Sequence, residues 1–298
     1  MWTPVMLLIA STTIADAQAA RAVAASPSAL HQRTVHVEGL SLHVVEAGPI
    51  DAPALLLLHG FMVSSATYET LQKHLATRYR VIALDAPGHG QSSRPCRELD
   101  AVYQARVTLG VLDALGVDRV VIVGQSMGAM TGLALAARAP RRVRHLIAIN
   151  PAGFDPGALR RMGMGLFVQE SMYRSGPELA FWLTALGSSQ DLGEPGLADL
   201  NEQLQLQRDP GWARSMASVY RSLRAGGGET LARQVTVPVT LVFGLQDAAY
   251  DESYRARIRA TLPAARVVDV ENCGHNVHHD APQRLIEIVD ETASRVGL

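Results

Sequence analysis

The chain has 298 residues, enough for one large domain with a sizeable core and an inserted segment. Its 27 basic and 28 acidic side chains leave a net charge of −1, and no basic patch with interleaved aromatic residues occurs. This balance gives no indication of nucleic-acid binding, so a small-molecule partner is expected, and the oligomeric state is left open. The two cysteines, Cys96 and Cys273, are too few for a disulfide framework or a cysteine-based metal site, and the sequence does not say whether they pair.

Residues 1–30 differ from the rest of the chain because they are rich in Ala, Ser and Thr. An apolar stretch at Val5–Ala10 precedes the small-x-small pattern Ala15–Ala17, although the first basic residue is Arg21. We predict a signal peptide and export to the periplasm or the medium; the alternative is a disordered tail on a cytoplasmic protein. The apolar stretch is shorter than the roughly 20 residues that span a bilayer, so no stable membrane span is expected.

The first predicted elements form the edge of a sheet. Polar and apolar residues alternate over 33–38 and 42–46, which predicts an antiparallel hairpin. The continuous apolar run Ala54–Leu58 is typical of a strand buried on both faces. Helical spacing over Tyr68–Ala76 and a second buried strand at Val81–Leu84 complete a βαβ unit.

The same alternation of strand and helix continues. A helix capped by Asp100 is predicted to end at Gly116, and the apolar run Arg119–Val123 leads into an Ala/Leu-rich helix that reaches Arg138. Another strand follows at Arg144–Ile149. These repeats predict an α/β fold with a mostly parallel, doubly wound sheet, whose carboxyl edge holds the site.

The repeat breaks between residues 151 and 235, where glycines, methionines and helical fragments replace the strands. We predict that this segment is a helical lid inserted into a core made of residues 31–150 and 236–298. Further core elements are predicted as strands at 239–243 and 266–270 and helices at 252–261 and 281–296.

A strand, a tight turn and a helix meet at Gly124–Gly128, which reads G-Q-S-M-G. Its Ser126 needs a base to take its proton and a carboxylate to orient that base. Both should leave the carboxyl ends of later strands, where Asp247 and His275 stand. The alternative is a small-residue turn without chemistry.

Five motifs occur in register from about residue 33 to the end: H-G-F-M, D-A-P-G-H-G-Q-S, G-Q-S-M-G, G-L-Q-D and a final G-H. Together they resemble the α/β-hydrolase fold superfamily, in its serine-nucleophile branch of lid-containing carboxylesterases and C–C bond hydrolases. The resemblance implies a catalytic triad of Ser126, Asp247 and His275. It also implies an oxyanion hole formed by the backbone amides of Phe61 and Met127, with no cofactor and no metal.

Other acids and nucleophiles remain open as alternatives. Asp251 lies close to Asp247, and Asp155 follows another strand, but the turn after the strand favours Asp247. Cys273 is expected to be a packed thiol, because no strand-to-helix turn presents it.

Four further histidines stand in or beside these motifs. His59 and His89 are expected to have structural roles in their turns. His278 and His279 are expected near the surface or in the wall of the site, since no carboxylate or cysteine set accompanies them as metal ligands.

The resemblance implies that an ester is cleaved through an acyl-enzyme. Lactone hydrolysis, C–C bond hydrolysis and cofactor-free perhydrolysis by the same triad are alternatives, and a ligand receptor with incidental turnover is an alternative of another class. The expected substrate is small and largely apolar. Its candidate contacts are Met62, Met162, Phe167, Phe181 and Trp182.

Overall fold

The computed structural model of the protein describes residues 28–155, 209–248 and 250–298. Most of the predicted signal peptide and residues 156–208 of the predicted lid lie outside these ranges, so export and the lid boundaries stay predictions. Within the described ranges, no helix combines the length and the hydropathy that a bilayer crossing requires.

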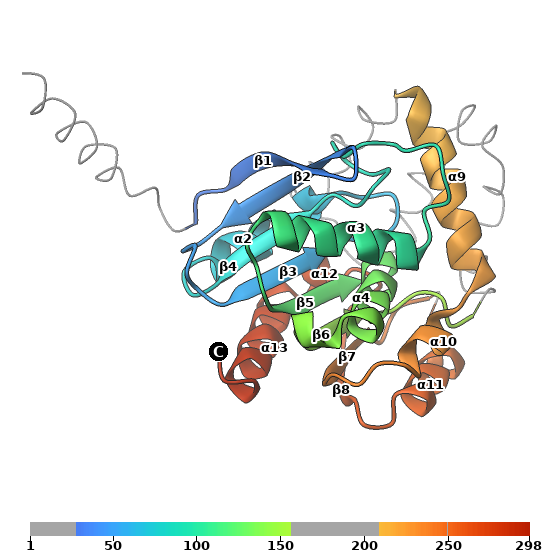
Figure 1. The fold of residues 1–298 in the computed structure, drawn as a ribbon. Helices are drawn as coiled ribbons and strands as arrows, with labels where there is room; N and C mark the ends of the chain where they lie inside the picture. Colours follow the sequence, from blue (N-terminus) through green and yellow to red (C-terminus); the bar gives the residue numbers. More distant parts are fainter. Residues whose placement is uncertain (1–27, 156–208, 249) are drawn as a thin grey trace, which may run out of the picture.

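The described residues form a sheet with helices on both sides (Figure 1). The strands are β1 (His31–Val37), β2 (Leu40–Ala47), β3 (Ala54–Leu58), β4 (Arg80–Leu84), β5 (Val120–Gln125), β6 (Val143–Ile149), β7 (Val239–Gly244) and β8 (Arg266–Val270). The α-helices are α2 (Glu69–Leu75), α3 (Ala101–Ala114), α4 (Met127–Arg138), α9 (Pro210–Ala225), α10 (Gly228–Ala232), α11 (Glu252–Thr261), α12 (Val277–Asp280) and α13 (Pro282–Arg295). Short 3-10 helices lie at Ser65–Tyr68 and Pro140–Arg142.

The sheet has the order β1-β2-β4-β3-β5-β6-β7-β8. β1 and β2 form the predicted antiparallel edge hairpin, β2 also pairs antiparallel with β4, and every other pairing is parallel. The predicted mostly parallel α/β sheet is therefore confirmed. Because all strands from β3 onward point the same way, the loops after them meet at one edge.

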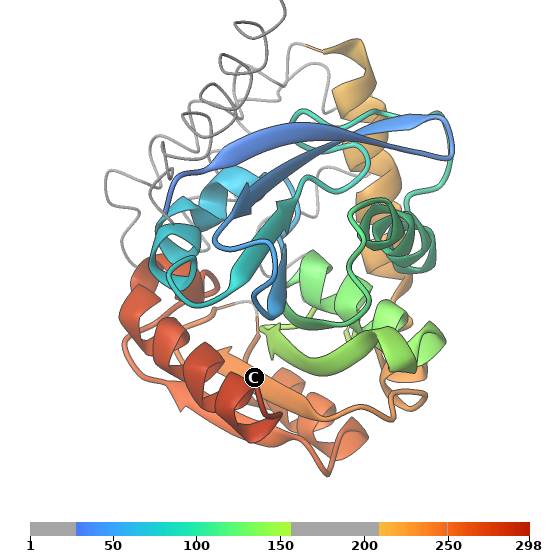
Figure 2. The ribbon, with the colours of Figure 1, turned by 60° about the vertical axis from the view of Figure 1, so that its left-hand side comes forward.

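Helices cover both faces of the sheet (Figure 2), and two clusters of apolar side chains fill the space between them and the sheet. Along β5, Val121 and Val123 belong to the cluster under α2 and α13, whereas Val120 and Ile122 belong to the cluster under α3 and α4. Since successive side chains of a strand point to opposite faces, a strand covered on both sides must be apolar throughout. This requirement explains the unbroken apolar runs in the sequence.

A buried histidine couples the stability of the sheet to pH. His145 on β6 is 6% exposed, and its Nε2 lies 2.9 Å from Thr240 Oγ1 on β7. Burial, together with the charges of Arg266 and Arg295, lowers the pKa of His145 from 6.5 to about 4. The unfolded chain therefore binds a proton between these two pH values that the folded chain does not, and stability falls on acidification through that window.

We expect His145→Gln to remove part of this acid sensitivity. Unfolding by urea above pH 6.5 and again near pH 4 should show a smaller difference in free energy for the variant than for the wild type, by about 2 to 3 kcal/mol. His36→Gln, at an exposed histidine of β1, is the control and should keep the full difference. An unchanged pH dependence in His145→Gln would contradict the assignment.

Candidate active site

Ser126 stands on a strained turn between β5 and α4. Its φ of 53° and ψ of −110° fall outside the common regions for a residue with a side chain. The turn is also closely packed: a Cβ on Gly128 would lie 2.0 Å from the carbonyl oxygen of Leu58, and one on Gly124 would lie 2.6 Å from that of Gly128. Both glycines are therefore required, and the predicted sharp turn is present at the head of α4.

The acid and the histidine singled out from the sequence are in contact. His275 Nδ1 lies 2.6 Å from Asp247 Oδ2, and the two residues are 4% and 5% exposed. Because a carboxylate only accepts hydrogen bonds, the Nδ1 proton of His275 is donated to Asp247, and Nε2 keeps its lone pair. The rings of His275 and Tyr250 also pack nearly perpendicular to one another, with 4.9 Å between ring centroids.

The loops after β7 and β8 touch through their backbones. A Cβ on Gly244 would lie 2.0 Å from the carbonyl oxygen of Gly274. The amide of Gln246 donates to the carbonyl oxygen of Cys273 at 2.9 Å. The glycine of the G-L-Q-D motif thus permits the close approach that brings Asp247 to His275.

We expect Gly244→Ala to damage both stability and activity. The added methyl group meets backbone atoms of Gly274 that cannot rotate away, so overpacking should cost about 1 to 3 kcal/mol. A shift of about 1 Å in the acid–histidine pair should lower turnover by about 10². Gly110→Ala is the control, because its Cβ would meet only the side chain of Val37; an equal loss of activity there would contradict the argument.

His59 fixes the loop that follows β3. Its Nε2 accepts a hydrogen bond from the amide of Ala86 at 3.0 Å, and its Nδ1 lies 2.7 Å from the carbonyl oxygen of Gly60. Burial lowers the pKa of His59, so the ring is neutral and matches this donor and acceptor pattern. The expected structural role of His59 agrees with these contacts.

The backbone amides of Phe61 and Met127 have no hydrogen-bond partner among the described residues. Met127 is the first residue of α4, where a helix leaves its amides unpaired and carries a partial positive charge. Met62 beside Phe61 is buried, with a φ of 66°. Two unpaired amides, one from the loop after β3 and one from the head of α4, are suited to binding a negatively charged oxygen.

The D-A-P-G-H-G-Q-S loop is organised by a buried carboxylate. Asp85 accepts hydrogen bonds from the amides of Ser65 and Gln91, at 2.7 and 2.8 Å, and from His43 Nδ1 at 2.9 Å. Burial acts to raise the pKa of Asp85, but the hydrogen bonds from His43 and from the amide of Ser65 hold it below its ordinary value. These bonds fix the path of the loop, and its histidine, His89, is buried.

The other acids and the thiols considered as catalytic groups have different environments. Asp251 caps α11 by accepting a hydrogen bond from the Tyr254 amide at 2.9 Å, and Asp155 stands at the border of the described residues. Cys96 and Cys273 are both free. Cys96 is exposed, whereas burial raises the pKa of the Cys273 thiol to about 12, which makes it a poor nucleophile.

His278 and His279 share one hydroxyl group. The Nε2 atoms of both rings lie 2.8 Å from Thr67 Oγ1, and His278 is buried against Tyr68 rather than placed at the surface. Burial lowers the pKa of His279 to about 4. Across the described ranges, no three His, Cys, Asp or Glu side chains are grouped as metal ligands.

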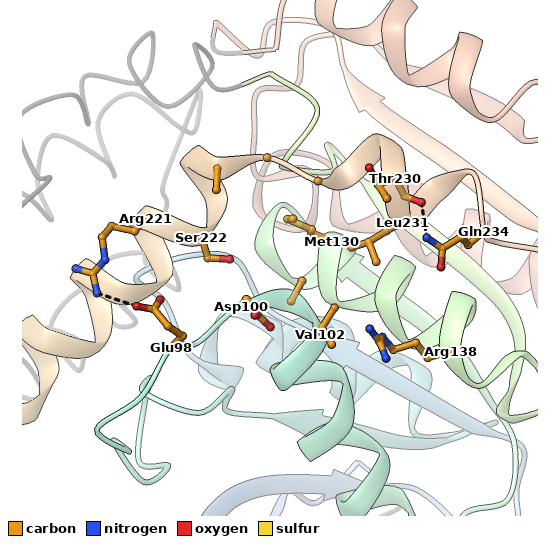
Figure 3. A pocket seen from close by; sticks show the side chains of 14 residues that line it. Glu98, Asp100, Val102, Met130, Arg138, Arg221, Ser222, Thr230, Leu231 and Gln234 are labelled. Carbon is orange, nitrogen blue, oxygen red and sulfur yellow. Dashed lines mark hydrogen bonds and ion pairs between the residues drawn. The ribbon is translucent and has the colours of Figure 1, made fainter.

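Four candidate substrate contacts, namely Met162, Phe167, Phe181 and Trp182, lie outside the described residues. A cavity of about 660 Å³ formed by described residues lies between α3, α4, α9 and α10, with the Glu98–Arg221 pair on one side and Arg138 on the other (Figure 3). None of the residues predicted for the triad or the oxyanion hole lines it. It is therefore separate from the acid–histidine pair.

Two amide side chains that the sequence analysis did not single out lie beside the acid–histidine pair. Gln125 ends β5 and Asn150 directly follows β6, and both donate hydrogen bonds to the carbonyl oxygen of His275. Their position at the carboxyl edge of the sheet was a usable signal, although no motif marks them.

Comparison with known proteins identifies the family. Residues 53–282 match the α/β-hydrolase fold. The chain belongs to this family. The α/β-hydrolase is 27% identical over 256 residues to the pimeloyl-(acyl-carrier protein) methyl ester esterase of Nitrosomonas europaea, covering 84% of this chain and 98% of that one. It is 28% identical over 251 residues to a carboxylesterase of Bacillus subtilis, covering 81% and 80% of the two chains.

Among solved structures, the α/β-hydrolase is similar to a bacterial membrane phospholipase A, with a TM-score of 0.75 and 25% identity. That match covers 96% of this chain and 92% of the other. The family identification agrees with the observed sheet, and the relatives include esterases.

Proposed function

We propose that the protein is a serine hydrolase that cleaves small, largely apolar carboxylic esters through an acyl-enzyme. The observation that carries the proposal is the 2.6 Å contact between Asp247 and His275, at the sheet edge where the turn presents Ser126. An imidazole oriented by a buried carboxylate is the base that a serine hydroxyl needs near neutral pH.

In the first half-reaction, Ser126 Oγ attacks the ester carbonyl carbon while His275 Nε2 takes the hydroxyl proton. The electron pair of the C=O bond moves to its oxygen, which accepts hydrogen bonds from the amides of Phe61 and Met127. As the intermediate collapses, the C–O bond to the alcohol breaks, and His275 gives its proton to the leaving oxygen. The products are an alcohol and an acyl group on Ser126.

In the second half-reaction, His275 takes a proton from water, and the resulting hydroxide attacks the acyl carbon. The same amides bind the oxyanion, the bond to Ser126 Oγ breaks, and His275 returns the proton to the serine. The protein needs no cofactor for either half-reaction. Met127 contributes further because the dipole of α4 favours negative charge at its first turn.

One observation supports an ester, and a second supports a serine nucleophile. The esterase of Nitrosomonas europaea and the carboxylesterase of Bacillus subtilis match across most of the chain and are named for ester cleavage. In addition, a serine stands at the centre of the G-x-S-x-G turn, the position of the nucleophile in the serine hydrolases of this fold. Both observations favour an acyl-serine intermediate.

A substrate panel tests the proposal. The purified protein is assayed with short p-nitrophenyl esters, lactones and vinylogous diketones, and Ser126 is labelled with a fluorophosphonate. Steady ester turnover that the label abolishes supports the proposal. Turnover of lactones or diketones alone would replace the ester by those substrates, and labelling without any turnover would favour a receptor.

A further inference from the structure

The loop that carries His275 is held by two buried amides from neighbouring strands. Gln125 Nε2 lies 3.3 Å and Asn150 Nδ2 lies 3.0 Å from the carbonyl oxygen of His275. Gln125 is 2% exposed and Asn150 is fully buried. A carbonyl oxygen has two lone pairs, so the two donors together saturate it.

Asn150 joins three segments. Its Nδ2 also lies 3.3 Å from the carbonyl oxygen of Gly274, and its Oδ1 accepts from the amide of Gly244 at 3.3 Å. Its own amide donates to the carbonyl oxygen of Val242 at 2.9 Å. Its φ of 40° is in the left-handed region, which asparagine tolerates better than most residues. One side chain thus connects the ends of β6 and β7 with the histidine loop.

Gln125 joins a different set of segments. Its Nε2 also lies 3.2 Å from Oδ1 of Asn276, the residue after His275. Its Oε1 lies so close to Gly60 that a Cβ there would be 2.1 Å away. Gln125 therefore packs between the turn of Ser126, the loop of Phe61 and the histidine loop.

We propose that Asn150 and Gln125 are positioning residues that hold the main chain of His275, so that its ring faces Ser126 while it stays bonded to Asp247. This inference rests on the proposed function, in which His275 is the base. A base displaced by about 1 Å loses about 10² in rate, so two hydrogen bonds to its main chain bear directly on turnover.

Asn150→Asp tests the proposal with little change in shape. The side chain still accepts from the amide of Gly244, but a buried carboxyl group is neutral and offers at most one donor, where the amide offers two hydrogens to the carbonyl oxygens of Gly274 and His275.

The matched control is Gln72→Glu. Gln72 is 1% exposed, and its Nε2 donates to the carbonyl oxygen of Val45 at 2.9 Å, which is the same chemistry between α2 and β2. The second test variant is Gln125→Met, which removes the donor at similar volume in case Asn150→Asp does not fold.

For both test variants we expect ester kcat to fall by about 10- to 100-fold with KM changed by less than about threefold. The control should keep kcat and KM, even where its resistance to urea falls. Test variants that fold and behave like the control would overturn the proposal.

A readout without substrate separates this inference from the proposed function. The low-field proton NMR signal of His275 Nδ1–H reports its bond to Asp247 whether or not an ester is turned over. We expect this signal to shift or broaden in the folded test variants and to persist in Gln72→Glu. Absence of esterase activity in the wild-type protein would contradict the proposed function. An unchanged NMR signal in both test variants would contradict the positioning role.

Discussion

Ser126→Ala is expected to reduce kcat for ester hydrolysis by about 10⁶, the size of loss measured when a triad serine is removed from another hydrolase. The variant keeps the amides of Phe61 and Met127, so substrate binding should persist while no acyl-enzyme forms. Steady-state assay with a p-nitrophenyl ester, combined with mass spectrometry of the fluorophosphonate-treated protein, measures both effects.

Ser253→Ala is the control for that experiment, because Ser253 is an exposed serine on α11. It should retain full turnover and full labelling. Ester hydrolysis that continues unchanged in Ser126→Ala would mean that another group attacks the substrate.

Asp247→Asn is expected to reduce kcat by about 10⁴ with the protein folded. The amide is close in shape to the carboxylate, but it no longer requires the proton of His275 to sit on Nδ1. When the proton moves to Nε2, the ring cannot accept the proton of Ser126. The pH dependence of kcat and the low-field proton signal of His275 measure the change.

Asp251→Asn provides the comparison, since asparagine also caps a helix and should preserve the bond to the Tyr254 amide. Its turnover should stay within about threefold of wild type, because Asp251 is exposed and its substitution keeps the helix cap. If the two variants lost activity equally, the carboxylate that serves His275 would have to be reassigned.

The elements were predictable because the signals that define them are local. The apolar run at Ala54–Leu58, the cap at Asp100 and the left-handed glycine at Gly116 each depend on neighbours a few residues away, and all three appear in the structure. The spatial order of the strands depends on contacts between distant residues. That β3 lies between β4 and β5 could therefore not be read from periodicity.

The residues of the site also differ in whether a local sequence pattern marks them. Ser126, Asp247 and His275 carry recognisable motifs, and the structure brings the last two into contact. Asn150 and Gln125 act through main-chain hydrogen bonds, which leave no spacing pattern in a sequence. Tyr250 packs on the ring of His275, and such a ring contact between residues distant in the sequence leaves no spacing pattern either.

The pairing of β6 with β7 has a consequence for how the protein folds. Leu146 pairs with Val239, so the long connection between them must close before β7 and β8 can join the sheet. Closing a long connection is slow relative to forming contacts between sequence neighbours, such as those of β5 and α4. The Ser126 turn is thus expected to form early, and Asp247 and His275 are expected to reach their positions last. An incompletely folded chain would therefore contain the nucleophile without the groups that activate it.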